Sequence, residues 1–177
     1  RDEEGEVVGE SVDSPSDFGR IAAFAAKQVI NQRIRDIGDD KVLGEFRGRE
    51  GDIIAGVIQQ GPNPRMIHVD LGTVEAILPP EEQVPGEDYS HGRRLRVFVT
   101  KVERGSKGPQ ITVSRTHPSL VRKLFALEVP EIASGVVEIV SLAREAGHRS
   151  KIAVRATQEG INPKGACIGE LGARVRA

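Results

Sequence analysis

The feature of this sequence best suited to a chemical role is a pair of glycines two residues apart, Gly169 and Gly172. Because glycine has no side chain, the backbone at both positions can approach a sugar-phosphate chain closely. A helix that begins directly after such a turn directs amide donors and the positive end of its dipole at phosphate. Gly169, Glu170, Leu171 and Gly172 are therefore candidates to contact a phosphate-bearing chain. The alternative is an ordinary turn between helices, in which a glycine ends the first helix.

The charged residues around this turn are one carboxylate, which disfavours an anionic ligand, and three cations, which favour one. Glu170 is unfavourable, since its carboxylate repels phosphate. Three cations stand close by in the sequence, namely Lys164, Arg174 and Arg176. We expect these cations to offset Glu170 and to neutralise phosphate charge.

The elements around the turn follow a recognisable order. Thr116-His117-Pro118 begins a helix with an apolar face, strands are expected at 136–143 and 151–156, and a short helix precedes Gly169. The order helix, strand, strand, short helix, G-x-x-G, helix resembles the KH domain of the bacterial type, type II. This resemblance implies that the turn clamps about four nucleotides of single-stranded RNA.

The middle of the chain alternates between short apolar runs and turn residues. Five strands are predicted, at 53–58, 66–71, 74–78, 95–99 and 111–114, and glycines and prolines separate them. Five strands in about seventy residues, with no strong helix between them, indicate a small closed barrel of the oligonucleotide-binding (OB) architecture. Periodicity alone leaves another small β-barrel open.

This segment also resembles the RNA-binding repeat of ribosomal protein S-one. The resemblance rests on 51–58, 69–72, 76–79 and 111–115. Repeats that stack bases usually present several aromatic residues, and this segment has three, so we expect a weak or auxiliary RNA site that relies on charge.

Four residues of the barrel are candidates for RNA contact. Strand alternation predicts that Arg94 and Arg96 point to one face while Leu95 and Val97 point inward. His68 and Tyr89 are candidate base contacts. The alternatives are a solvated outer face for the two arginines and a partly buried, hydrogen-bonded role for His68.

A long helix is predicted before the barrel. Ser14–Asp17 supplies its capping residues, apolar residues recur at helical spacing from Phe18 to Ile37, and Gly38 with the next two aspartates ends it. The single apolar stripe indicates packing on a neighbouring domain, which we expect upstream of Arg1.

The charge of the chain is unevenly distributed. The 177 residues include 25 Lys and Arg against 26 Asp and Glu, a net charge of -1, which argues against a nucleic-acid binder when taken as one number. Residues 1–45 carry 6 basic and 11 acidic residues (net -5), residues 46–117 carry 10 and 9 (net +1), and residues 118–177 carry 9 and 6 (net +3). The basic excess thus rises toward the glycine turn.

The composition also limits the class of protein. The single cysteine, Cys167, cannot form an internal disulfide, which favours a reducing, cytoplasmic compartment, and no stretch is apolar enough to span a membrane. No residues stand at the spacing of a catalytic or metal site, so we expect no enzyme activity, no metal and no cofactor. Cys167 is expected to be a small buried helix residue.

Taken together, these segments resemble the NusA family of bacterial transcription elongation and termination factors. The resemblance is carried by 26–30, 114–118, 128–132, 149–154 and 162–169. It implies an α+β, multidomain fold. Residues 1–45 would be the end of the polymerase-binding domain with its connecting helix, residues 46–116 the OB-fold barrel, and residues 117–177 a first KH domain truncated before its last strand.

The same resemblance implies a function and its partners. Family members associate with RNA polymerase, mainly through the upstream domain, with single-stranded nascent RNA, and with other elongation and antitermination factors, and they modulate pausing, termination and antitermination. Two alternatives remain: the RNA-binding module of a processing enzyme such as polynucleotide phosphorylase, whose KH domain precedes its barrel, and a ribosome-associated RNA-binding protein.

Overall fold

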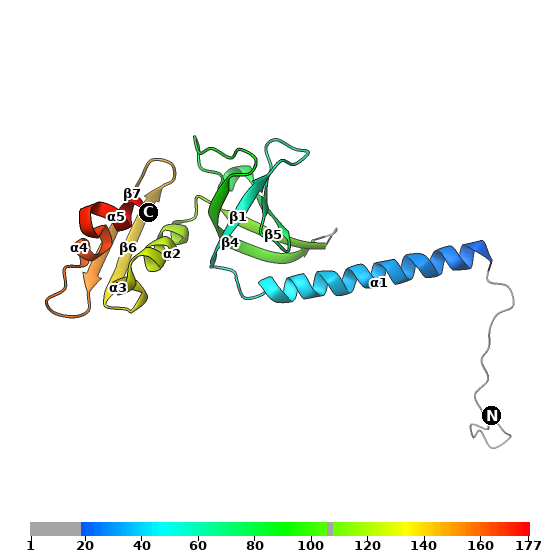
Figure 1. Cartoon of the computed structure of the whole chain (residues 1–177), viewed down its shortest axis with the longest axis horizontal. Coiled ribbons are helices and arrows are strands. Elements are labelled where there is room, and N and C mark those ends of the chain that lie inside the picture. Colours follow the sequence, from blue (N-terminus) through cyan, green and yellow to red (C-terminus); the bar gives the residue numbers. More distant parts are fainter. Residues whose placement is uncertain (1–18, 106–107) are drawn as a thin grey trace, which may run out of the picture. The chain divides into compact units, whose positions relative to one another are not determined.

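The computed structural model describes residues 19–105 and 108–177 (Figure 1). Its elements, in chain order, are α1 (Arg20–Phe46), β1 (Ile53–Gln59), β2 (Ile67–Asp70), β3 (Glu75–Leu78), a 3-10 turn (Pro80–Glu82), β4 (Arg94–Gly105), β5 (Gly108–Ser114), α2 (Pro118–Glu128), α3 (Pro130–Ala133), β6 (Val137–Glu145), β7 (Arg149–Ala156), α4 (Pro163–Ile168), a second 3-10 turn (Glu170–Gly172) and α5 (Ala173–Arg176). The chain divides into two compact units between Gly38 and Asp39. Within the described ranges, no helix has the length and apolar character that crossing a membrane requires.

Strands β1 to β5 form a closed barrel in the order β1-β2-β3-β5-β4 (Figure 1). All neighbouring pairs are antiparallel except β3 and β5, which are parallel. Alternate aliphatic residues fill the interior, including Ile58, Val69, Leu78, Val97 and Ile111. The predicted five-stranded OB-like barrel is therefore confirmed.

The hairpin of β4 and β5 is longer than the sequence indicated. β4 continues past the predicted end at Val99 to Gly105, which pairs with Gly108 across the hairpin. The register shifts between Val99 and Lys101, and the Thr100 hydroxyl donates to the carbonyl of Thr112 at 2.9 Å. This bulge moves the later side chains to the opposite face of the strand. The alternating pattern of apolar and polar residues therefore breaks at Val99, and the prediction ended the strand there.

The prediction that α1 ends at Gly38 is wrong. The helix continues through Gly38 and ends at Phe46, whose side chain is 2% exposed, while Val42 packs against the barrel core. A glycine inside a helix costs about 1 kcal/mol, which is less than the burial of a phenylalanine stabilises. The predicted capping residues Ser14–Asp17 lie outside the described residues.

The first turns of α1 carry an exposed apolar stripe. Ile21 is 86% exposed and Phe24 is 64% exposed, and the isoleucines at 30, 34 and 37 are more than half exposed. The apolar residues therefore repeat at helical spacing as predicted, and they are accessible in this chain.

The last part of the chain forms a KH-like α/β region, as predicted. His117 caps α2, since the Ser119 amide donates to its Nδ1 at 3.1 Å, and Pro118 occupies the first turn. β6 and β7 form an antiparallel hairpin, longer at the turn than the strands predicted at 136–143 and 151–156. The helices α2, α4 and α5 contact this hairpin or one another.

The buried end of α1 gives a first prediction. Phe46→Ala is expected to lower the free energy of unfolding of the barrel by about 3 to 5 kcal/mol, because it leaves a cavity in the core. Urea unfolding followed by circular dichroism measures this change. Phe24→Ala removes the same side chain from an exposed site of the same helix and should change stability by less than about 0.5 kcal/mol. Equal effects of the two substitutions would contradict the placement of Phe46.

Candidate nucleic-acid interface

The glycine turn begins where α4 ends. Asn162 caps α4 by accepting a hydrogen bond from the Gly165 amide at 3.0 Å, and Pro163 occupies the first turn. The helix ends at Gly169, which has φ 71° and ψ 174°. This conformation is essentially limited to glycine, because a side chain would collide with the backbone. Glycine is therefore required at position 169 for the chain to turn away at the end of α4.

Two later residues of the turn, Leu171 and Gly172, have left-handed backbone. Leu171 has φ 49° and Gly172 has φ 77°, and Leu171 is the only residue other than glycine with positive φ in the described part of the chain. The side chain of Leu171 is 93% exposed. A strained, exposed residue at the tip of a glycine turn fits a surface that a ligand contacts, because strain of this kind concentrates at binding sites.

The Arg174 guanidinium forms hydrogen bonds within the protein. Its Nη1 donates to Glu131 Oε2 of α3 and to the carbonyl of Ala166, both at 2.7 Å. A Cβ on Gly169 would lie 2.7 Å from Arg174 Cγ, so glycine also makes room for this side chain. The backbone amide of Glu131 and the Arg174 guanidinium lower the pKa of the Glu131 carboxyl. Arg174 thus supports the turn through Nη1, and its phosphate contact stays a prediction.

The other two predicted cations are exposed beside the turn. Arg176 donates to the carbonyl of Leu171, and Lys164 lies on the exposed side of α4. Lys164 also lines an apolar cavity of about 230 Å³ together with Cys167, Ile168 and residues of α2, β7 and α5. The structure therefore places two cations and an apolar cavity near the exposed turn.

Cys167 is 8% exposed, as expected for a small residue of a packed helix. Burial raises the pKa of its thiol, and the nearby Glu131 carboxylate adds to this effect. A raised pKa keeps the thiol protonated, which is unsuited to a nucleophile. Among the residues that the structure describes, no cluster of three histidine, cysteine or acidic side chains is placed to hold a metal ion.

The two predicted barrel arginines differ in their surroundings. Both lie on the outer face of β4, and Val97 is fully buried, as alternation predicted. Arg94 is exposed, whereas Arg96 Nη1 donates to Glu128 Oε1 of α2 at 2.8 Å. Arg96 therefore joins the barrel to α2, whereas Arg94 makes no ion pair with the residues that the structure describes.

Tyr89 and His68 are held by neighbouring side chains. The Tyr89 hydroxyl donates to Glu87 at 2.7 Å and accepts from the Val84 amide at 2.8 Å, and its ring packs against the barrel core. Burial and Glu87 raise the pKa of Tyr89 to about 12. The side chain of His68 is 20% exposed and its Nδ1 contacts the carboxylate of Glu75. Both side chains are therefore partly buried and paired with carboxylates, which matches the alternative role given for His68, while the base contacts of both residues stay predictions.

A hydrogen-bonded junction that the sequence did not reveal joins the barrel to the KH-like region. The buried Ser114 hydroxyl accepts from the amides of Thr116 at 3.1 Å and His117 at 2.9 Å. The Arg115 guanidinium pairs with the carboxylate of Glu87 and donates to the carbonyl of Arg96 at 2.7 Å. The only available signal was the Ser-Arg-Thr-His-Pro motif at 114–118.

Arg144 and an aromatic stack complete this junction. Arg144 of β6 donates to the carbonyls of Arg115 at 2.7 Å and His117 at 3.0 Å. The rings of Phe98 and His117 stack with centroids 4.5 Å apart. Burial and the charge of Arg115 lower the pKa of Arg144. Two arginines, one carboxylate and one stacked pair thus connect three strands to the start of α2.

Comparisons with known proteins cover both ends of the chain. Residues 115–177 match the sequence model of the NusA-like first KH domain, and residues 1–40 match that of the NusA N-terminal domain. The transcription termination/antitermination protein NusA of Mycobacterium tuberculosis is 58% identical over 182 residues, which cover 99% of this chain and 52% of that protein.

Relatives from other bacteria agree with this match. The proteins of the same name from Bacillus subtilis and Thermus thermophilus are 51% and 40% identical, over 97% and 93% of this chain and over 47% and 42% of their own lengths. The chain spans about half the length of the curated relatives that it matches.

The junction gives a second prediction, on pH. Burial alone would raise the pKa of Glu87, but hydrogen bonds from Arg115 and Tyr89 outweigh it and hold the pKa below the ordinary 4.5. A lowered folded-state pKa stabilises the fold above the ordinary value, and this contribution is lost as the pH falls through the folded-state pKa. Glu87→Gln should therefore lower the free energy of unfolding by about 1 to 3 kcal/mol at neutral pH.

Urea unfolding at neutral and acidic pH measures this difference. The gap between Glu87→Gln and the unchanged chain should narrow as the pH falls below 4.5, since the carboxyl of the unchanged chain then becomes neutral as well. Glu81→Gln, an exposed carboxylate on the preceding 3-10 turn, is the control and should have a smaller effect. A gap that is constant with pH would contradict the charged pairing of Glu87 with Arg115.

Proposed function

This chain belongs to the NusA family, and we propose that it is the part of a transcription termination/antitermination factor that holds nascent single-stranded RNA. The whole protein would associate with bacterial RNA polymerase through its upstream domain and with other elongation and antitermination factors. It would act in the cytoplasm, by modulating pausing, termination and antitermination rather than by catalysing a reaction.

The observation that carries the proposal is the backbone of Gly169–Gly172. Three of its four residues have positive φ, and the Leu171 side chain projects into solvent. Glycine at 169 leaves room for the Arg174 side chain that supports the turn, the tip at Leu171 stays exposed to a sugar-phosphate chain, and α5 begins immediately after the turn. A KH turn of this kind holds about four nucleotides by their backbone.

The cations around the turn divide into two roles. Lys164 and Arg176 are exposed and would neutralise phosphates, while Arg174 supports the turn through Glu131 and the Ala166 carbonyl. The apolar cavity beside Lys164 would receive a base. Glu170 is exposed and reduces the attraction for phosphate, so the grip is expected to be light.

The barrel would add auxiliary contacts. Arg94 is its accessible predicted cation, whereas Tyr89 and His68 are held by carboxylates. Base stacking on aromatic rings contributes about 1 to 3 kcal/mol per base, and these barrel positions present no row of exposed rings for it. We therefore assign the main RNA contact to the KH turn.

This assignment gives a third prediction. Replacing both Gly169 and Gly172 by Asp should weaken single-stranded RNA binding at fixed salt by about tenfold or more, because it places side chains and two negative charges on the phosphate path. Fluorescence anisotropy with a labelled oligonucleotide measures the affinity. A thermal melt of the same sample checks that the barrel stays folded.

A matched control separates the turn from general charge. Gly135 and Gly160 also have positive φ, and an added Cβ at either site meets no atom within 4 Å. Replacing both by Asp gives the same change in net charge in the same region and should leave the affinity within about threefold of the unchanged chain. An equal loss of RNA affinity in the two double variants would contradict the proposal that the turn contacts RNA.

A further inference from the structure

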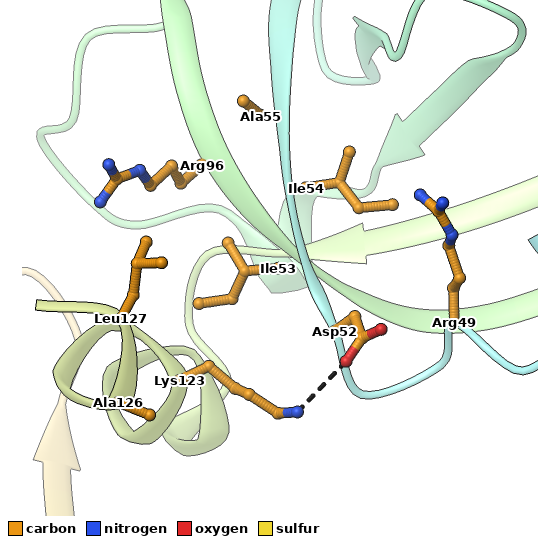
Figure 2. A pocket seen from close by; sticks show the side chains of 9 residues that line it. All are labelled: Arg49, Asp52, Ile53, Ile54, Ala55, Arg96, Lys123, Ala126 and Leu127. Atoms are coloured by element: carbon orange, nitrogen blue, oxygen red, sulfur yellow. Dashed lines mark hydrogen bonds and ion pairs between the residues drawn. The ribbon is translucent and has the colours of Figure 1, made fainter. Parts of the chain in front are cut away.

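A second cavity lies where the outer face of the barrel meets α2 (Figure 2). Its volume is about 480 Å³, and the side chains that matter here are Arg49, Asp52, Ile53, Arg96, Lys123 and Leu127. Small-molecule sites in proteins commonly enclose about 300 to 1,000 Å³, a range that a nucleotide fits. We name this cavity the junction cleft.

The junction cleft carries more positive than negative charge. Three of its lining side chains are cations and one, Asp52, is a carboxylate. Lys123 Nζ lies 3.1 Å from Asp52 Oδ1, the pair drawn dashed in Figure 2, and both side chains are about half exposed. An ammonium group has three donors, so this pairing leaves two for another acceptor.

The two arginines also retain donors. Arg96 uses Nη1 for Glu128 and is 44% exposed, which leaves the rest of its five N–H groups for other acceptors. Arg49 makes no ion pair with any residue in the ranges 19–105 and 108–177, and its guanidinium lies 5.7 Å from the centroid of the Phe46 ring. The cleft therefore presents donors to an anion from both the barrel and α2.

The same cleft has an apolar surface between its cations. Figure 2 shows Ile53 of β1 and Leu127 of α2 lying between Arg96 and Lys123. Leu127 is 60% exposed, so its side chain is accessible to a ligand in the cleft. An anion attached to a flat apolar group would satisfy both kinds of surface, and a nucleotide is such a molecule.

A shared residue connects the junction cleft to the KH turn. Arg96 also lines a neighbouring cavity of about 160 Å³, together with Arg174 and Val175 of α5, the helix that follows Gly172. The two cavities therefore adjoin at one side chain. Arg96 and Arg174 therefore place the junction cleft beside the helix that follows the turn.

We propose that the junction cleft binds one nucleotide of the same single-stranded RNA that the KH turn holds. Arg49 and Lys123 neutralise the phosphates on either side of this nucleotide, and its base lies against Ile53 and Leu127. The inference rests on the proposed function, since it requires RNA on the KH turn. An acidic peptide is the competing occupant, but it would leave the apolar surface uncovered.

The test compares two double variants with the same change in net charge. Arg49→Ala with Lys123→Ala removes the two phosphate contacts of the cleft. The control variant carries Arg47→Ala and Arg122→Ala. Arg47 lies two residues before Arg49 and Arg122 lies one residue before Lys123, and both are exposed cations that do not line the cleft. Fluorescence anisotropy is measured over a series of salt concentrations with single-stranded RNAs of about 12 and about 4 nucleotides, the shorter of which fills the KH turn alone. A thermal melt confirms that each variant is folded.

The cleft variant should bind the longer RNA about 25-fold more weakly at 0.1 M salt, with a salt slope about 1.4 less steep, because each single-strand phosphate contact contributes about 0.7. Its affinity for the shorter RNA should be unchanged, and the control variant should stay within about threefold for both RNAs. This pattern supports a nucleotide in the cleft.

Several outcomes would overturn the proposal. Equal losses in the cleft and control variants would mean that only general charge is involved. An unchanged affinity of the cleft variant for the longer RNA would mean that RNA does not reach the cleft. A poly-glutamate peptide that binds the unchanged chain, fails to bind the cleft variant and leaves RNA affinity unaltered would identify a protein partner instead. If the unchanged chain binds neither RNA, the proposed function fails first, and the cleft assignment fails with it.

Discussion

The arrangement of the proposed RNA-binding surface depends on one partly buried ion pair, between Arg115 and Glu87. Arg115 is the first residue after the barrel, and it also holds the carbonyl of Arg96, while Arg144 of β6 holds the carbonyl of Arg115 itself. A half-buried pair of this kind is costly to break on one side only, because the remaining charge keeps little solvation. The barrel therefore continues into the KH-like region through a chain of charged hydrogen bonds rather than through a flexible linker.

This junction explains why cations that look alike in the sequence have different roles. Arg96 and Arg174 each pair with a carboxylate of α2 or α3 and connect elements, whereas Arg94, Lys164 and Arg176 make no ion pair with the residues that the structure describes. Structural arginines can still keep donors for a ligand, since a carboxylate rarely uses all five N–H groups. The basic excess of the last sixty residues is thus shared between supporting the glycine turn and attracting phosphate.

The sequence predicted those features whose causes are local. Glycines at 169 and 172 indicate a turn because only glycine readily takes the backbone angles found there, and alternating apolar residues predict barrel strands. It could not predict the partners of Arg174 and Arg96, which lie 43 and 32 residues away along the chain. It also placed the end of α1 at Gly38, since the burial that extends this helix to Phe46 comes from the barrel and not from the helix itself.

The glycine turn is proposed to hold RNA, and the same strand is proposed to continue toward the barrel. Amide NMR spectra of the isotopically labelled chain, titrated with one single-stranded RNA of about 12 nucleotides, test this proposal most directly. The amides of Gly169–Gly172 and those of Asp52–Ile54 are expected to shift together and to saturate with one dissociation constant. Shifts in the barrel with none in Gly169–Gly172 at saturation would contradict the proposal.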